Sequence, residues 1–105
     1  MPTPFQIAVY KALEKIPEGR VTTYSAIARH LNTNAVRAVG TAVGKNPYAP
    51  KVPCHRVVPA SGKIGNYSGE GGVERKIELL RQEGVFVEEG RIKNFEKRMY
   101  DFGDQ

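Results

Sequence analysis

Apolar residues recur every three or four positions near the N-terminus, which is the spacing of one face of a helix. The residues of this face are Phe5, Ala8, Val9, Ala12, Leu13 and Ile16. Thr3 and Gln6 have the spacing of a capping box, and Pro4 suits a first helical turn. The pattern predicts a helix that begins at Thr3–Pro4 and ends before the turn residues of segment 17–20.

Two shorter helices are predicted next, over residues 24–31 and 35–44, with Thr23 and Asn34 as their N-cap residues. Only the polar turn 32–34 separates them. Two short helices joined by a turn of about three residues are typical of a helix-turn-helix.

The second of these helices has an unusual surface. Val36, Val39 and Val43 share one stripe, which we expect to face the core. The remaining side chains are small, and Arg37 is the only long one. A helix that reads bases in the major groove needs several long polar side chains, whereas Gly40 costs about 1 kcal/mol relative to Ala in a helix interior. The flat surface favours close approach of a large body, either a duplex gripped without base readout or another helix.

The second half of the chain alternates irregular and regular segments. Residues 45–53 hold three prolines and are predicted to be irregular. The segment 55–65 resembles a short strand, a turn and a return. A glycine-rich loop follows over 66–72.

An amphipathic helix is predicted over 73–83, with Gly84 as its stop signal. Its apolar side consists of Val73, Ile77 and Leu80. Residues 85–93 read as a small hairpin around Glu89-Gly90, and residues 94–105 fit either a short helix or a loose tail. Together the pattern predicts a mainly helical α+β domain over 1–93, winged-helix-like with short strands, and a C-terminal tail over 94–105.

Composition narrows the setting of the protein. The chain has 105 residues, of which 40% are hydrophobic, and this suits one compact domain. No apolar run approaches the roughly 20 residues that cross a bilayer, and the N-terminus lacks the features of a signal peptide. The single cysteine cannot form an internal disulfide. We therefore expect a reducing compartment, the cytoplasm or, in a eukaryote, the nucleus.

The positive charge is concentrated in the first part of the chain. Residues 1–63 carry nine Lys/Arg and two Glu, a balance of +7, whereas residues 64–105 carry seven basic and nine acidic residues, a balance of −2. A basic footprint of this kind fits either a polyanion such as nucleic acid or an ordinary solvated surface.

The cysteine, Cys54, stands in the stretch "VPCHRVV" and has three candidate roles. One Cys with His30 and His55 falls short of the four ligands of a structural metal site, so no metal is expected. A buried, inert thiol is a common role for free cysteine. A nucleophile would need its pKa lowered from about 8.5, which His55 and Arg56 favour. An extended segment would point Cys54 and His55 to opposite sides, so a bridging water would be needed.

The stretch "PCHRVV", preceded by "RAVGTAVGKNP" and followed by "GNYSG" and "LLRQEG", closely resembles O6-alkylguanine-DNA alkyltransferase. The resemblance covers residues 4 to about 92, includes "IPEGRVTTYSAIA", and keeps the family's motif order and spacing. It implies that the chain corresponds to the catalytic, DNA-binding domain of that family.

The resemblance implies a role for each motif residue. Cys54 accepts the alkyl group, His55 takes the thiol proton through a water, and Glu83 completes this relay. Asn46 buttresses the turn between the helix-turn-helix and the active site. Tyr24 crowds the phosphate of the target nucleotide and donates a proton to the leaving base. Taken singly, Tyr24 also fits a core residue, Glu83 a solvated helix end and Asn46 a turn former before proline.

The resemblance also implies the DNA contacts and the substrate pocket. Arg37 fills the gap that the extruded base leaves, and the flat helix lies in the minor groove. The implied DNA-binding residues are Thr23, Tyr24, Ala35, Arg37, Ala38, Gly40 and Thr41. The implied pocket residues are Val43, Val58, Tyr67 and Ser68. The implied partner is double-stranded DNA that contains O6-alkylguanine, with no metal, no cofactor and no membrane, and the protein is expected to act as a monomer.

Three departures from the family pattern stand out. The family usually carries a further domain before this one, the loop "SGEGG" is about two residues longer than "SGG", and Lys51 replaces an apolar residue. A related non-enzymatic group, the alkyltransferase-like proteins, carries tryptophan at the position of Cys54, and this chain has no tryptophan. We therefore expect single-use transfer of alkyl groups, chiefly methyl, to Cys54. The alternative is a lesion sensor or a DNA-binding regulator.

Overall fold

The structure is a computed structural model that describes residues 2–67 and 69–103. Its helices are α1 (Pro4–Glu14), α2 (Tyr24–His30), α3 (Val36–Gly44), α4 (Gly72–Gln82) and α5 (Phe95–Arg98), and a 3-10 turn, η1, covers Cys54–Arg56. Its strands are β1 (Thr22–Thr23), β2 (Val57–Val58), β3 (Val87–Glu88) and β4 (Arg91–Ile92). The predicted mainly helical α+β fold is confirmed. Among the described residues, no helix has the length and apolar character to cross a membrane.

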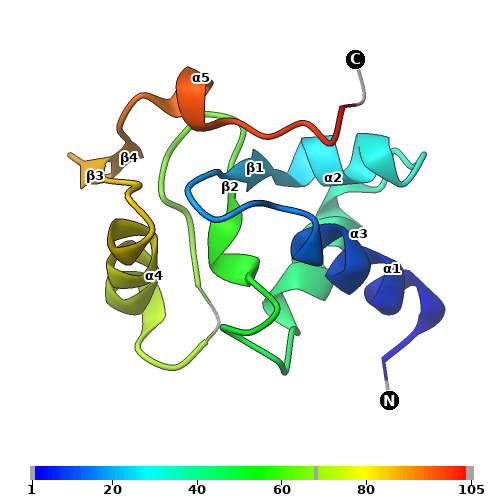
Figure 1. Ribbon diagram of the computed structural model, residues 1–105. Coiled ribbons are helices and arrows are strands. Elements are labelled where there is room, and N and C mark those ends of the chain that lie inside the picture. The colour runs from blue at the N-terminus through cyan, green and yellow to red at the C-terminus, as the bar shows by residue number, and fades with distance from the viewer. Residues whose placement is uncertain (1, 68, 104–105) are drawn as a thin grey trace.

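The first three helices form one side of the molecule, and α4 with the β3–β4 hairpin forms the other (Figure 1). Two of the predicted N-caps are confirmed. Thr3 and Gln6 make a complete capping box at α1, and the Thr23 hydroxyl accepts a hydrogen bond of 3.0 Å from the Ala26 amide at α2. The predicted cap at Asn34 is wrong, because α3 has Ala35 at its N-cap and no side-chain cap.

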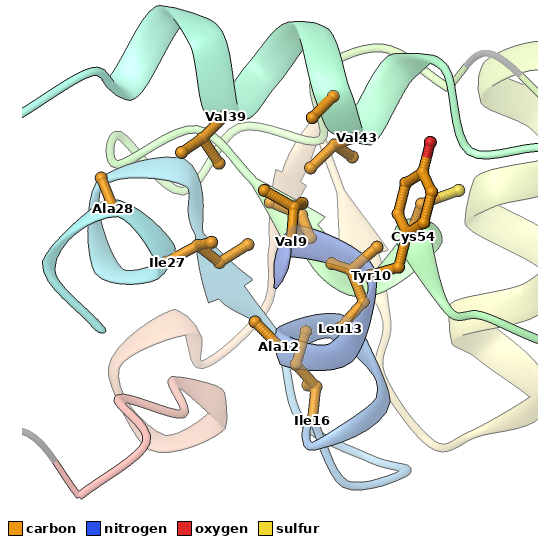
Figure 2. Close-up of a cluster of buried hydrophobic side chains, with 12 residues drawn as sticks. Val9, Tyr10, Ala12, Leu13, Ile16, Ile27, Ala28, Val39, Val43 and Cys54 are labelled. Atoms are coloured by element: carbon orange, nitrogen blue, oxygen red, sulfur yellow. The ribbon is translucent and has the colours of Figure 1, made fainter. Parts of the chain in front are cut away.

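The main core lies where α1, α2 and α3 meet (Figure 2). Its larger side chains come from all three helices and include Val9, Leu13, Ile27 and Val39, all fully buried. Val43 is buried as the sequence predicts, but the prediction that Val36 faces the core is wrong. Val36 lies in the first turn of α3 and is 39% exposed.

A parallel pairing of β1 with β2 joins the two sides of the molecule. Thr22 lies opposite Val57, and Thr23 lies opposite Val58. The sequence suggested that segment 55–65 would fold back on itself, but the partner of β2 is β1, which lies directly before α2. The hairpin around Glu89 is confirmed: β3 pairs antiparallel with β4. Its two turn residues have φ of 53° and 77°, as a tight two-residue hairpin requires.

Residues 94–103 pack against the rest of the domain. Of the two alternatives for this region, the structure contains the short helix, α5, and a strand-like segment follows it beside β1. The Tyr100 amide donates to the carbonyl of Val21 at 2.7 Å, and the Thr22 hydroxyl donates to the carbonyl of Tyr100 at 2.6 Å. Farther on, the ring of Phe102 stacks on His30 with 4.4 Å between centroids.

A second, smaller core lies beneath α4. It consists of Val21, Val58, Leu80, Val85 and Ile92. The predicted helix and its stop are confirmed, since Gly84 follows α4 with φ of 86°. Its buried face differs from the prediction, however, because it contains Lys76 as well as Leu79 and Leu80.

Candidate functional site

Cys54 begins the 3-10 turn η1, directly after the irregular proline-rich segment. The Cys54 amide donates to the carbonyl of Val52 at 2.8 Å, and the Arg56 amide donates to the carbonyl of Pro53 at 3.0 Å. The extended conformation expected for Cys54 and His55 is therefore wrong. The turn holds the thiol in the main core with 4% of the residue exposed. In Figure 2, Cys54 and Tyr10 lie together at the end of the core opposite Ala28.

Cys54 lines a cavity of about 550 Å³ between α3 and the loop after β2. Six of the residues expected at the site line it with the thiol, namely Tyr24, Arg37, Gly40, Thr41, Val43 and Tyr67. The sequence prediction missed the opposite wall, which Pro59, Gly65 and Asn66 supply. Gly65 has φ of 70°, and a Cβ there would lie only 2.7 Å from Pro59 Cδ. This close packing explains the glycine of "GNYSG" as a requirement of the cavity wall.

His55 and Arg56 share one carboxylate partner, Glu83. His55 Nε2 lies 2.9 Å from Glu83 Oε2, while Arg56 Nε and Nη2 donate to Oε1 and Oε2 at 2.9 Å and 2.7 Å. A third bond, from Arg56 Nη1 to the carbonyl of Ile16 at 2.7 Å, ties the cluster to the segment just after α1. The side chains of Glu83 and Arg56 are only 11% and 15% exposed. The alternative interpretation of Glu83 as a solvated residue at a helix end is therefore wrong.

The electrostatics of this cluster define the state of the imidazole. Burial lowers the pKa of His55 more than Glu83 raises it, so the ring is neutral near pH 7. Burial pushes the pKa of Glu83 up, but bonds from Arg56 and His55 outweigh it and lower the pKa. An ionised Glu83 accepts from His55 Nε2–H, which leaves Nδ1 as an acceptor. Nδ1 is buried and has no hydrogen-bond partner among the described residues.

The thiol itself differs from the sequence expectation. Burial raises the pKa of Cys54, although the Asn46 amide and the charge of Lys76 act in the opposite direction. In the free protein, therefore, desolvation dominates, and the expected depression of the thiol pKa is wrong. Asn46 also donates to the carbonyl of Val52 at 2.8 Å and accepts from the amide of Tyr48 at 3.0 Å. These bonds place Asn46 on the turn before Cys54, where the sequence predicted a buttress.

Three tyrosines surround the thiol. Burial first, and the nearby Cys54 second, raise the pKa of Tyr24, and the pKa of Tyr10 and of Tyr67 is also raised. All three phenols are therefore neutral near pH 7 and retain a proton to donate. The sequence pattern identified Tyr24 and Tyr67 through the motifs, but Tyr10 appeared only as part of the α1 helix.

The exposed face of α3 matches the predicted contact surface in part. Ala35, Arg37, Ala38 and Thr41 are exposed, and Gly40 is half-buried. Thr23 differs, because its side chain is buried and occupied as the cap of α2.

Two predicted pocket residues have a different outcome. Val58 is fully buried in the second core and does not line the cavity, where its neighbour Pro59 stands. Ser68 lies outside the described residues.

The described residues contain no group of three or more His, Cys, Asp or Glu side chains placed to hold a metal ion. The chemistry that this part of the chain offers is a buried thiol that lines a cavity with the phenols of Tyr24 and Tyr67. The neighbouring residue, His55, adds a neutral imidazole whose Nδ1 has no hydrogen-bond partner among the described residues.

The sequence and the fold of this chain are similar to those of known proteins. A family model described as "6-O-methylguanine DNA methyltransferase, DNA binding domain" matches residues 4–85. The methylated-DNA–protein-cysteine methyltransferase of Shigella flexneri is 49% identical over 86 residues, which are 81% of this chain and 49% of the relative. The protein of the same name from Saccharolobus solfataricus is 49% identical over 86 residues, with 82% and 54% covered. The chain thus spans about half the length of the curated relatives it matches.

Solved structures with the same fold include two protein–DNA complexes. Mycobacterium tuberculosis OGT in complex with DNA has a TM-score of 0.74 and 49% identity, with 79% of this chain and 51% of that chain covered. S. pombe Atl1, in complex with damaged DNA containing O6-carboxymethylguanine, has a TM-score of 0.80 and 33% identity. That similarity covers 95% of this chain and 98% of Atl1.

Proposed function

Because the chain belongs to the family of 6-O-methylguanine DNA methyltransferase DNA-binding domains, we propose that it binds duplex DNA containing O6-alkylguanine and accepts the alkyl group on Cys54. The observation that carries the proposal is the shared cavity. Cys54 lines this cavity with Tyr24 and Arg37, and its neighbour His55 is held by Glu83. A buried thiol without a function would need neither the cavity nor the imidazole–carboxylate pair.

The exposed, flat face of α3 contacts the DNA. Its exposed alanines leave the backbone accessible, so the helix enters the minor groove and makes contacts that do not depend on sequence. Arg37 is exposed at the mouth of the cavity and takes the place of the base that leaves the stack. Extrusion of a base costs a few kcal/mol, which such a plug helps to offset. The bound partner is therefore an alkylated duplex with the target guanine inside the Cys54 cavity.

Transfer begins with the thiol proton. His55 Nδ1 is an acceptor without a hydrogen-bond partner in the described part of the chain, and one bridging water carries the Cys54 proton to it. Glu83 stabilises the imidazolium that forms. The base also displaces water from the cavity, and the Cys54 thiolate attacks the alkyl carbon attached to O6 of guanine.

Alkyl transfer to Cys54 is accompanied by protonation of the leaving guanine. As the S–C bond forms, the C–O6 bond breaks, and its electron pair stays with the guanine. Tyr24 donates its phenolic proton to the leaving base, and the proton held by His55 returns to the phenolate. The products are an S-alkyl Cys54 thioether and ordinary guanine. Because the thioether is stable and does not release the alkyl group, each molecule acts once. The step uses only residues of this chain, so the protein acts as a monomer without metal or cofactor. A reducing compartment keeps the Cys54 thiol from being oxidised.

The test is stoichiometric transfer from a duplex with a single O6-methylguanine. Intact mass and peptide mapping should find one added methyl per chain, located on Cys54, while a duplex with ordinary guanine should add none. Cys54→Ser should keep its affinity for the lesion and lose transfer by about 10³-fold or more, as expected when a nucleophile is removed. Release of methyl from many lesions per protein molecule would contradict the single-use mechanism.

A second candidate is recognition of the lesion without transfer. One observation favours it: this chain and Atl1 cover each other almost completely, at 95% and 98%, and that structure contains DNA with O6-carboxymethylguanine. The two candidates differ in one measurement. If the wild-type chain binds O6-methylguanine duplex in preference to ordinary duplex and its mass stays unchanged after long incubation, the protein is a sensor.

A further inference from the structure

Lys76 has an environment that the proposed mechanism does not explain. It lies in the first half of α4, and its side chain is fully buried, with 0% of the residue exposed. Lysine is almost never buried to this degree without a partner, because moving an ammonium out of water costs several kcal/mol. Within residues 2–67 and 69–103, no carboxylate lies within ion-pair distance of its Nζ atom.

The hydrogen bonds of Lys76 reach the wall of the Cys54 cavity. Its Nζ donates to the carbonyl of Ile64 at 2.6 Å and to the carbonyl of Asn66 at 3.0 Å. Between these two residues lies Gly65, where a Cβ would stand 3.6 Å from Nζ. Asn66 and Gly65 both line the cavity. Lys76 therefore ties the wall opposite α3 to α4.

Two carbonyls do not balance a buried positive charge. An ammonium has three protons to donate, and the described residues accept two of them. Burial lowers the pKa of Lys76 to about 8, and the interaction that opposes this shift comes from Cys54. In turn, the charge of Lys76 lowers the pKa of Cys54 against the effect of burial. Each group thus favours the charged form of the other.

Among the described residues, the other groups around the thiol do not supply a positive charge. Tyr10, Tyr24 and Tyr67 face Cys54 as neutral phenols, and each has its pKa raised partly by that thiol. Asn46 contributes a hydrogen bond. His55 is neutral in the free protein, and its pKa is lowered in part by Lys76. Lys76 is therefore the cation that acts on Cys54 within the described residues.

We propose that Lys76 is a positioning residue whose ammonium is the counter-ion of the Cys54 thiolate, and that its two carbonyl bonds keep the cavity wall 64–66 in place for the bound base. The transfer part of this inference rests on the proposed function, but the pairing of Lys76 with Cys54 does not. When the base fills the cavity and excludes water, an ion pair between the two becomes stronger. The thiol proton still leaves through His55, and Lys76 keeps its own protons throughout.

The first experiment measures the pH dependence of thiol alkylation by iodoacetamide, which is unambiguous because the chain has one cysteine. Lys76→Gln keeps an N–H donor for the carbonyls and loses the charge, whereas Lys76→Met loses both. Relative to wild type, Lys76→Gln should shift the midpoint upward by about 0.7 to 1 pH unit, which slows alkylation at pH 7.5 by about fivefold to tenfold. Lys97→Met, which removes a charge from an exposed position, should leave the profile unchanged.

The second experiment keeps Lys76 and so remains decisive if its variants do not fold. The side-chain ¹³Cε resonance of Lys76 should titrate at a lower pH in Cys54→Ser than in wild type, because serine cannot form the anion that stabilises the ammonium. An unchanged Lys76 midpoint in Cys54→Ser, or identical thiol profiles for folded Lys76→Gln and wild type, overturns the proposal.

The outcome for Lys76 is separable from the outcome for the proposed function. If methyl transfer from O6-methylguanine duplex fails while both titrations shift as expected, the proposed function is wrong and the Lys76–Cys54 pair stands. If transfer proceeds in wild type and is equally fast in Lys76→Gln, the inference about Lys76 fails and the proposed function stands. Loss of transfer in Lys76→Gln with lesion affinity retained supports both.

Discussion

Two helices serve the Cys54 cavity in opposite ways. On α3 the buried residues are apolar, Val39, Ala42 and Val43, and the exposed face is small and nearly uncharged apart from Arg37. On α4 the exposed face is charged, and a lysine lies on the buried face beside Leu79 and Leu80. The helix also ends at Glu83, whose carboxylate holds His55 and Arg56. Helix α3 thus presents an exposed contact surface, whereas α4 supplies the largely buried charged groups Lys76 and Glu83.

This difference teaches where stability and function can be separated. The exposed face of α3 makes few contacts within the protein, so changes there should alter DNA binding and leave the fold intact. The inward groups of α4 have buried partners, so changes there should alter stability and chemistry together. The predictions that follow test this division, from the largest expected effect to the smallest.

The largest effect is expected at the end of α4. Glu83→Gln removes the charge that compensates Arg56, and breaking a largely buried ion pair of this kind should lower the free energy of unfolding by about 2–4 kcal/mol. It should also slow methyl transfer, because His55 loses the group that stabilises its imidazolium. Urea unfolding and single-turnover transfer measure the two effects. Glu78→Gln, in the exposed pair with Arg81 on the same helix, is the matched control and should change neither. Equal effects of the two substitutions would remove the contrast between the inner and outer faces of α4.

The next effect is expected on α3. Arg37→Ala should weaken binding of O6-methylguanine duplex by about tenfold or more, since the extruded base loses its substitute in the stack. The free energy of unfolding should stay within about 0.5 kcal/mol of wild type, as is usual for exposed positions. Fluorescence anisotropy at fixed salt measures the affinity, and Arg81→Ala, the same change of charge on α4, should have little effect. A loss of stability in Arg37→Ala would contradict the division between the helices.

A smaller, pH-dependent effect follows from the His55 imidazole. Its pKa is lower in the folded protein than the ordinary histidine value of about 6.5 because the ring is buried, so below that pH the unfolded chain binds a proton that the folded chain does not. The contribution of His55 to the free energy of unfolding should therefore be fully present above about pH 6.5. It should fall as the pH decreases below that value, by up to about 1.4 kcal/mol per pH unit for one proton. Urea unfolding between pH 7.5 and 5.5 measures this slope, which should be reduced in His55→Gln. An equal slope in both proteins would assign the effect to other groups.

The smallest effect is expected at Gly40 on α3, where stability and binding should move in opposite directions. A Cβ on Gly40 would meet Tyr24 Cδ1 at 3.8 Å, an ordinary contact. Gly40→Ala should therefore raise the free energy of unfolding by about 0.5–1 kcal/mol through helix propensity, while the added methyl weakens binding of duplex DNA. Thermal unfolding and anisotropy measure the pair of effects. A variant that is both less stable and weaker in binding would mean that the methyl distorts the helix.

The same contrast explains what the sequence could predict. Helix caps and periodic apolar residues are local signals, so α1, the stop at Gly84 and the hairpin at Glu89 were predicted correctly. The motifs around Cys54 identified the family, and seven of the fifteen residues that they implied line the cavity. The prediction that Val36 is buried was wrong because periodicity shows which residues share one face of a helix, but it does not show how far along the helix that face is covered by other elements.

Other features depend on contacts between distant segments and had no local signal. A lysine in an amphipathic helix reads as an exposed residue, and nothing in the sequence places Lys76 against the loop carbonyls of Ile64 and Asn66. The pairing of β1 with β2 and the burial that raises the pKa of Cys54 are likewise properties of the assembled fold. The thiol was expected to be activated by its neighbours in sequence, whereas desolvation by the main core has the larger effect.

The segment beside β1 has a consequence for the order of folding. The contacts among α1, α2 and α3 join residues close in the sequence, and such local contacts form fast. The backbone partners of Val21, in contrast, are Arg98 and Tyr100 near the other end of the chain. During synthesis the three helices can therefore assemble first. The backbone of Val21, just before β1, can pair only after residues 98–100 have been synthesised. We expect this last closure, between Val21 and residues 98–100, to be the slowest step of folding.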